Sequence, residues 1–208
     1  WQLNTHLNAE LAGNLPIKGN VVLQSDEHQA NLQLNGDLSN LNLNLETQGQ
    51  YPLSLTAMAN LKQKNYPFEL NGKIKQWLID AQSNELKVRN VSLNAKGNAD
   101  DYQLSLQGNS QLGAYPAVDL NTQLKGSLTK ATLQALSIKA NESSATIQAN
   151  VDWQKGIQAN FNGTLANLKA QYLTDAATSD ISGQFKGSFN AADDKWQLQM
   201  NNTKLNGL

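Results

Sequence analysis

The sequence predicts an all-β protein built on an elongated, strongly curved and mostly antiparallel sheet. Apolar and polar residues alternate with a period of two along most of the chain. Clusters of turn-forming residues interrupt that alternation at short intervals. The 208 residues include 27 Asn, 21 Gln and 32 Leu, whereas soluble helical proteins use more Ala, Glu and Lys. Strands with one apolar and one hydrated face are typical of antiparallel sheets.

The apolar residues of each predicted strand keep one parity. In chain order these sets are Ala30/Leu32/Leu34/Gly36/Leu38, Leu41/Leu43/Leu45, Tyr51/Leu53/Leu55/Ala57/Ala59/Leu61, Val91/Leu93/Ala95, Leu104/Leu106, Leu120/Leu124/Leu128, Ala145/Ile147/Ala149/Val151 and Ile157/Ala159/Phe161.

Turn-rich clusters separate these runs. They lie at 25–28, 62–65, 81–84, 98–101, 113–116, 141–144, 154–156 and 190–195. Their spacing predicts roughly 15 strands connected as a meander.

Asn-Gly dipeptides usually mark two-residue hairpins, but parity opposes that interpretation at three of the four in this chain. A hairpin at Asn35-Gly36 would place Leu34 opposite Asp37 and mix the apolar face. A continuous strand keeps Leu32, Leu34, Gly36 and Leu38 in phase. The same test favours continuous strands at Asn71-Gly72 and Asn162-Gly163.

Several glycines therefore lie in phase with the leucines. A glycine on an apolar face weakens a strand unless the backbone bends or something packs closely there. One interpretation is strong bending where the sheet folds over, and another is that the gaps make room for a ligand chain. The two are compatible, because a sharply curved sheet encloses a trough.

The segment 165–179 departs from the period of two. Leu165, Leu168, Tyr172 and Ala176 follow spacings of three and four residues, which predicts a short connecting helix at about 167–178.

Composition excludes several classes of function. A net charge of −1 and a pI near 6.1 provide no basic field for nucleic acid. With no cysteine there are no disulfides and no thiolate nucleophiles, which suits an oxidising compartment such as a bacterial periplasm. No apolar run approaches the roughly 18 residues of a membrane-spanning helix. The chain starts at Trp1 without a leader pattern, so we expect a mature protein or an excised piece.

The sequence contains no constellation that suggests catalysis, a metal or a cofactor. His6 and His28 are its only histidines and lack ligand spacing. The acidic pairs Asp100-Asp101 and Asp193-Asp194 lie in polar clusters without the spacing of a calcium loop, so we expect solvated hairpin tips. We expect no enzyme, no cofactor and no catalytic or metal-binding residues.

A run of short segments between Glu85 and Gly207 resembles the TamB family, the translocation and assembly module subunit, in an interior part of that protein. The segments are Glu85-Leu-Lys-Val, Lys96-Gly-Asn, Tyr102-Gln-Leu-Ser-Leu, Pro116-Ala-Val-Asp-Leu, Leu133-Gln-Ala-Leu, Val151-Asp-Trp-Gln, Asn162-Gly-Thr-Leu, Gly187-Ser-Phe, Lys195-Trp-Gln-Leu-Gln-Met and Lys204-Leu-Asn-Gly. TamB belongs to the wider AsmA-like group.

The resemblance implies a U-shaped, taco-like sheet with an apolar groove. It also implies residues 1–208 as a single elongated groove segment of a longer protein. That protein would be a periplasmic bridge, anchored to the inner membrane through a segment absent from this chain. It would carry phospholipid to the outer membrane and help to assemble outer-membrane proteins. Its partners would be phospholipid acyl chains, neighbouring segments of the same chain and, through the full-length protein, the outer-membrane barrel TamA.

The expected groove is the apolar face defined by the alternation. The predicted lining residues are Leu32, Leu34, Leu43, Leu45, Leu53, Leu55, Phe68, Leu70, Ile74, Val91, Leu93, Leu104, Leu106, Leu120, Leu124, Ile147, Phe161, Phe185 and Leu198, with the glycines Gly36, Gly72, Gly97, Gly108, Gly126, Gly163, Gly183 and Gly187.

Two other architectures use the same alternation. A secreted β-solenoid stalk would close the apolar face into a dry core, although the chain shows no fixed repeat. An outer-membrane barrel would turn the leucines toward lipid, and 13 aromatic residues without girdles at strand ends count against it.

Overall fold

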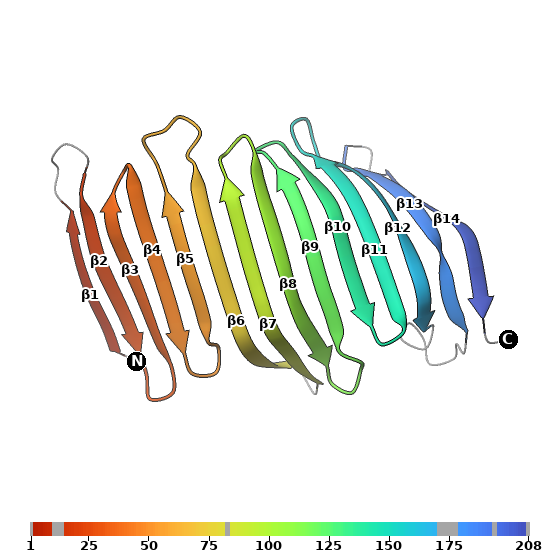
Figure 1. Cartoon of the computed structure of the whole chain (residues 1–208), viewed down its shortest axis with the longest axis horizontal. Helices are drawn as coiled ribbons and strands as arrows, with labels where there is room; N and C mark the ends of the chain where they lie inside the picture. Colours follow the sequence, from red (N-terminus) through yellow and green to blue (C-terminus); the bar gives the residue numbers. More distant parts are fainter. Residues whose placement is uncertain (1, 10–14, 82–83, 170–178, 193–194, 207–208) are drawn as a thin grey trace. The chain divides into compact units, whose positions relative to one another are not determined.

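The computed structural model describes residues 2–9, 15–81, 84–169, 179–192 and 195–206. These residues form fourteen β-strands and no helix, against roughly 15 strands expected. All pairs of neighbouring strands described below are antiparallel (Figure 1). The all-β, antiparallel prediction is confirmed.

The chain divides into two compact units. Unit 1, Trp1–Ala114, holds eight strands, and each pairs with the next along the chain. They are β1 (Gln2–Ala9), β2 (Ile17–Gln24), β3 (Gln29–Asp37), β4 (Asn40–Gln48), β5 (Leu53–Ala59), β6 (Phe68–Ala81), β7 (Asn84–Gly97) and β8 (Tyr102–Leu112).

Unit 2, Tyr115–Leu208, holds six strands with the same consecutive order. They are β9 (Val118–Gly126), β10 (Lys130–Ala140), β11 (Ser143–Asp152), β12 (Gln158–Lys169), β13 (Asp180–Asn190) and β14 (Lys195–Asn206).

Short polar side chains form the tight connections. In the β3–β4 turn, Oδ1 of Asp37 accepts hydrogen bonds from the backbone N–H of Ser39 at 2.6 Å and of Asn40 at 3.1 Å. These bonds lower the pKa of the Asp37 carboxyl, with a smaller contribution from the charge of Lys62. Asp and Asn favour turns for this reason: their side chains mimic a backbone acceptor.

The structure separates the predicted mid-strand glycines into two kinds. Asn71-Gly72 and Asn162-Gly163 lie inside β6 and β12, as predicted. Asn35-Gly36 also lies within a strand, but β3 ends at Asp37 and Leu38 belongs to the turn. The extension to Leu38 is therefore wrong, because Gly36 adopts φ +119° and the Asp37 side chain closes the turn directly after it.

β-Bulges shift the phase of alternation inside several strands. In β7 the register with β8 shifts between Arg89 and Ser92, where Asn90 adopts a left-handed φ of 51°. In β10 the register shifts after Leu133. A bulge adds one residue to a strand and so moves the following side chains to the opposite face.

The predicted helix at 167–178 is wrong where the structure describes it. Residues 167–169 belong to strand β12, and Leu168 pairs with Ile181 of β13. A register shift between Leu165 and Leu168 produces the three-residue spacing that resembled a helical period. The remainder of that segment, residues 170–178, lies outside the described residues.

Connections two strands apart are hydrogen-bonded to one another. In unit 1 the backbone N–H of Leu61 donates to the carbonyl of Leu38 at 2.7 Å; in addition, the indole of Trp77, within strand β6, donates to the carbonyl of Pro52 in the β4–β5 connection at 3.0 Å. In unit 2 the Trp153 indole donates to the carbonyl of Leu128 at 2.6 Å. These bonds join the margins of each sheet beyond the strand ladders.

Candidate functional site

Strand pairing in unit 1 collects the apolar residues into four rows that run across the strands. Because directly opposed residues point to the same side of a sheet, the rows define one surface, the apolar face of unit 1. The rows, listed from β2 onward, are Ile17, Gly36, Leu41, Ala59, Phe68, Gly97 and Tyr102; Gly19, Leu34, Leu43, Ala57, Leu70, Ala95 and Leu104; Val21, Leu32, Leu45, Leu55, Gly72, Leu93 and Leu106; and Leu23, Ala30, Thr47, Leu53, Ile74 and Val91.

Unit 2 has an apolar face of the same design. Its rows, listed from β9 onward, are Gly126, Ala131, Val151, Ala159, Phe189 and Trp196; Leu124, Leu133, Ala149, Phe161, Gly187 and Leu198; Thr122, Leu136, Ile147, Gly163, Phe185 and Met200; and Leu120, Ile138, Ala145, Leu165 and Gly183.

The predicted lining residues lie in these rows, divided between the two units. Unit 1 brings together the leucines and other residues from Leu32 to Leu106, and unit 2 those from Leu120 to Leu198. The exception is Gly108, which has no direct row partner and lies beside Val91.

Sequence reasoning missed other members of the two faces. Leu136 and Ile138 follow the bulge in β10, so they fall out of phase with Leu133 in the sequence yet share its face. Trp196 and Met200 flank Leu198 on β14 with the same parity, a signal that was available in the alternation.

Both faces remain open among the described residues. Ala95, 6% exposed, is the only described apolar residue that is buried, and no described side chain of any size is fully buried. A sheet packed against a second layer would bury most of its inward leucines. Along β14 the exposure is greatest, 73% for Trp196 and 55% for Leu198.

Three glycines in the rows, Gly72, Gly163 and Gly187, leave no gap, because neighbouring side chains lean over them. A Cβ added at Gly72 would lie 3.3 Å from Leu55 and 3.5 Å from Leu93. In unit 2, the Phe161 ring covers its direct partner Gly187, and the Phe185 ring covers its direct partner Gly163. The two rings lie 6.4 Å apart and pack against each other at a tilt.

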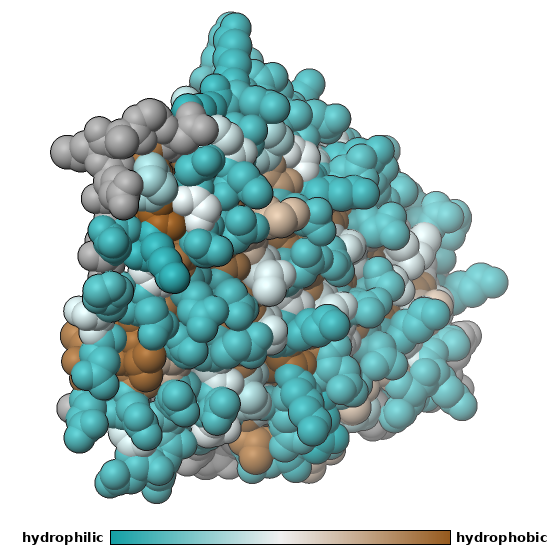
Figure 2. All heavy atoms as spheres, turned by 60° about the vertical axis from the view of Figure 1, so that its left-hand side comes forward, coloured by the Kyte–Doolittle hydropathy of each residue, from teal (hydrophilic) through white to brown (hydrophobic). Residues whose placement is uncertain are grey.

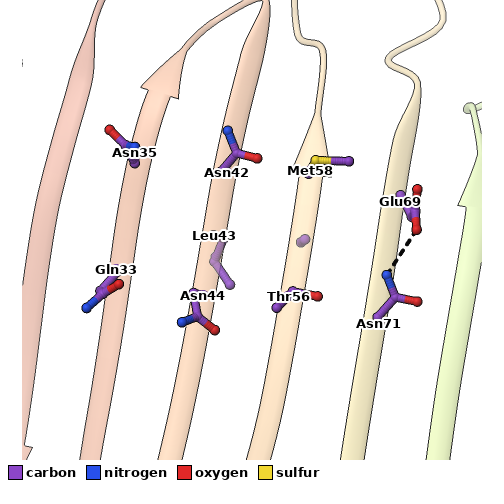
Figure 3. A pocket seen from close by; sticks show the side chains of 10 residues that line it. Gln33, Asn35, Asn42, Leu43, Asn44, Thr56, Met58, Glu69 and Asn71 are labelled. Atoms are coloured by element: carbon purple, nitrogen blue, oxygen red, sulfur yellow. Dashed lines mark hydrogen bonds between the residues drawn. The ribbon is translucent and has the colours of Figure 1, made fainter.

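The opposite face is hydrophilic, and it carries shallow hollows. One of about 350 Å³ lies over β3 to β6 (Figure 3), lined by the amides Gln33, Asn35, Asn42, Asn44 and Asn71 with Thr56, Met58 and Glu69, and also by Leu43 and Ala57 of the apolar rows. Asn71 donates to Oε1 of Glu69 at 3.1 Å. In a space-filling view polar side chains dominate the visible surface and apolar surface shows between them (Figure 2).

Ionisable groups form no cluster in the part of the chain that the structure describes. No group of three or more His, Asp or Glu side chains there could hold a metal ion. His6 lies on β1, whereas His28 stacks on Tyr51 with ring centroids 6.3 Å apart. Ion pairs join Lys87 to Glu85 at 2.9 Å within one strand, and Lys169 to Asp180 at 2.7 Å across one strand pair.

Among the described residues, no helix has the length and apolar character needed to cross a membrane.

Comparison with known proteins identifies the chain's family. A model of the family described as TamB, N-terminal domain, matches residues 1–208. The Translocation and assembly module subunit TamB of Haemophilus influenzae (strain ATCC 51907 / DSM 11121 / KW20 / Rd) is 23% identical over 199 residues, which cover 93% of this chain and 15% of that protein. No solved structure matches. The chain therefore belongs to the TamB family.

Proposed function

We propose that the two apolar faces shield phospholipid acyl chains as they move between the inner and outer membranes. The chain would do this as one segment of a periplasmic bridge. The single observation that carries the proposal is the open apolar face: four rows of aliphatic and aromatic side chains in each unit, partly exposed and without a covering layer among the described residues.

The energetics favour an apolar occupant. A contiguous apolar surface of this extent marks an interaction site in most soluble proteins. Each CH₂ group that leaves water for such a surface contributes about 0.8 kcal/mol. An acyl chain that slides along rows of leucine side chains keeps that contribution throughout, so transport requires no specific pocket.

The alternative is a structural stalk whose apolar face closes into a dry core. A β-solenoid coils its chain so that strands of successive turns stack in register. Here consecutive strands pair antiparallel within each unit, and the described apolar residues other than Ala95 keep some exposure. Both observations favour the open face.

Family membership supports the remainder of the proposal. The relative from Haemophilus influenzae is named as a translocation and assembly module subunit. We extend that role to this chain: a non-enzymatic component, anchored to the inner membrane by another segment of the protein, that assists outer-membrane assembly with a TamA-type barrel as partner.

Photo-crosslinking in cells tests the proposal. A probe at Leu106, which pairs with Leu93 on the apolar face, should yield phospholipid adducts. A probe at the adjacent Gln107, which pairs with Ser92 on the hydrophilic face, is the matched control and should yield none. A second pair, Ile147 and Gln148, repeats the comparison in unit 2.

Adducts at Leu106 and Ile147 alone would support an open lipid-carrying face. Absence of phospholipid adducts at all four positions would favour a closed core and overturn the transport role of this segment.

A further inference from the structure

The apolar faces contain no charged side chain in the rows that define them. Their hydrogen-bonding side chains are Thr5, which lies opposite Val21, Thr47 and Tyr102 in unit 1, and Thr122 and Trp196 in unit 2. A surface that recognises phosphate presents Arg, Lys or converging backbone N–H groups. These rows present none of those side chains.

The cations of the strands face the other way. Lys73 has Ser54 and Ser92 as its cross-strand partners, and Lys186 has Asn162 and Gln199. Since opposed residues share a face, both lysines lie among the polar side chains.

The same holds for the only arginine of the sequence, Arg89. Its cross-strand partners are Gln76 and Asn109, and neither belongs to an apolar row.

Taken together, the described connections of unit 1 carry four acidic residues and two lysines, Lys62 and Lys64, which both lie in the β5–β6 connection. The charge of Lys62, in the β5–β6 connection, acts on Asp37 in the β3–β4 turn. The β7–β8 connection carries Asp100 and Asp101, and the β2–β3 connection carries Asp26 and Glu27. Such margins provide no attractive field for an anionic headgroup.

From this distribution we infer that the apolar faces select their ligand by its acyl chains and do not discriminate between headgroups. The inference rests on the proposed function and deepens it. The headgroup stays in water beyond the rows, so zwitterionic and anionic phospholipids with the same chains bind equally well.

A competition experiment tests this. The full-length protein with a photo-probe at Leu106 is exposed to vesicles that contain equal amounts of phosphatidylethanolamine and phosphatidylglycerol with identical acyl chains. Mass spectrometry then counts the two adducts. We expect a ratio of the two adducts within about twofold of unity at low salt, because the rows carry no charged side chain. The ratio should stay the same at high salt, where any attraction to headgroup charge is screened.

A matched variant calibrates the assay. Leu23, 36% exposed at the end of its row, is replaced in Leu23→Lys, which places one cation on the face. This variant should enrich the phosphatidylglycerol adduct several-fold at low salt and lose that enrichment at high salt. If it does not fold, the competition on the parent protein still decides the question.

The outcomes separate the two claims. Enrichment of either lipid by more than tenfold on the parent protein would overturn headgroup indifference and leave lipid binding intact. Absence of both adducts would overturn the proposed function itself.

Discussion

At the scale of single residues, reciprocal pairing of Phe with Gly organises the apolar face of unit 2. Phe161 opposes Gly187 and Phe185 opposes Gly163 on the same two strands. Each ring lies over the glycine opposite it, where any larger residue would displace it. The two glycines therefore leave the space that the aromatic rings occupy.

Replacing one of these two glycines with a larger residue should destabilise unit 2. In Gly187→Ala the new Cβ would lie 2.6 Å from Cε2 of Phe161 and 2.5 Å from the carbonyl oxygen of Gln197. Overpacking of this kind costs roughly 1–3 kcal/mol. Urea unfolding followed by tryptophan fluorescence should show a lower midpoint.

The neighbouring substitution Ser188→Ala is the control, because Ser188 opposes the polar residues Asn160 and Gln197 on the hydrophilic face. Equal urea midpoints for Gly187→Ala and the parent protein would show that the Phe161 ring does not lie over Gly187 in solution.

The turn at Asp37 predicts a pH dependence. Its pKa lies below the usual 3.8, mainly because the N–H of Ser39 donates to the carboxylate. A lowered folded pKa contributes stability above the unfolded pKa, and that stability disappears as pH falls through the folded value. The difference in urea midpoint between the parent and Asp37→Ala should be constant from pH 7 to about 5 and shrink below pH 4.

Asp37→Asn serves as the comparison, since its amide oxygen still accepts the Ser39 N–H without a charge. Its midpoint should fall between those of the other two proteins at pH 7. If the parent and Asp37→Ala differ equally at pH 3 and pH 7, the carboxylate does not stabilise the turn.

At the scale of elements, bulges keep the apolar residues on one face when the sequence changes phase. The left-handed Asn90 in β7 and Asn167 in β12 both lie at register shifts. Asn tolerates this backbone conformation better than other side-chain-bearing residues, and β-branched residues tolerate it least. At these two bulges, Asn therefore occupies the position where the backbone must adopt the left-handed conformation.

The stability of variants at Asn90 should depend on how well the new residue tolerates a left-handed backbone conformation, and not on its propensity to form strands. Asn90→Val, which favours a regular strand, should destabilise unit 1 by about 1–2 kcal/mol, whereas Asn90→Gly should be nearly neutral. Chemical denaturation of both variants measures this. A Val variant as stable as the parent would mean that β7 pairs without the bulge.

The indole bond between Trp153 and Leu128 ties the β11–β12 connection to the β9–β10 connection. Trp153→Phe keeps the ring and removes the donor, with an expected loss of about 0.5–1.5 kcal/mol. Amide hydrogen exchange at Ser127 to Lys130 should accelerate. Trp196→Phe, at a residue 73% exposed, is the control and should leave that exchange unchanged. Unchanged exchange in Trp153→Phe would show that the bond does not hold the connection.

At the scale of the molecule, the described residues form no fully buried core: Ala95 is the only apolar residue among them that is buried. A compact protein of 208 residues has a heat-capacity change of unfolding of about 2.5 to 3.1 kcal/mol/K. Because the leucines of the open faces keep part of their surface in water, calorimetry of the delipidated protein should give a value below about 2 kcal/mol/K. A value in the full range would mean that the faces are covered in solution.

The sequence predicted the strands and their faces well, because parity is a local property. Residues such as Leu32, Leu34, Leu43 and Leu45 needed only their own alternation to be placed on one side. Spacing alone does not distinguish a bulge from a helical turn, so the bulge before Leu168 has the same three-residue spacing in the sequence as a helix. The space above Gly163 depends on Phe185, 22 positions away and on another strand, which no local pattern contains.

Each strand within a unit pairs only with its neighbours in the chain. Nearly all pairing contacts are thus short in sequence, and closing each loop costs little entropy. A chain of this design can fold progressively from one end, each completed hairpin serving as the template for the next strand. Lengthening such a protein by further hairpins would add surface without adding a long-range step that every molecule must search for.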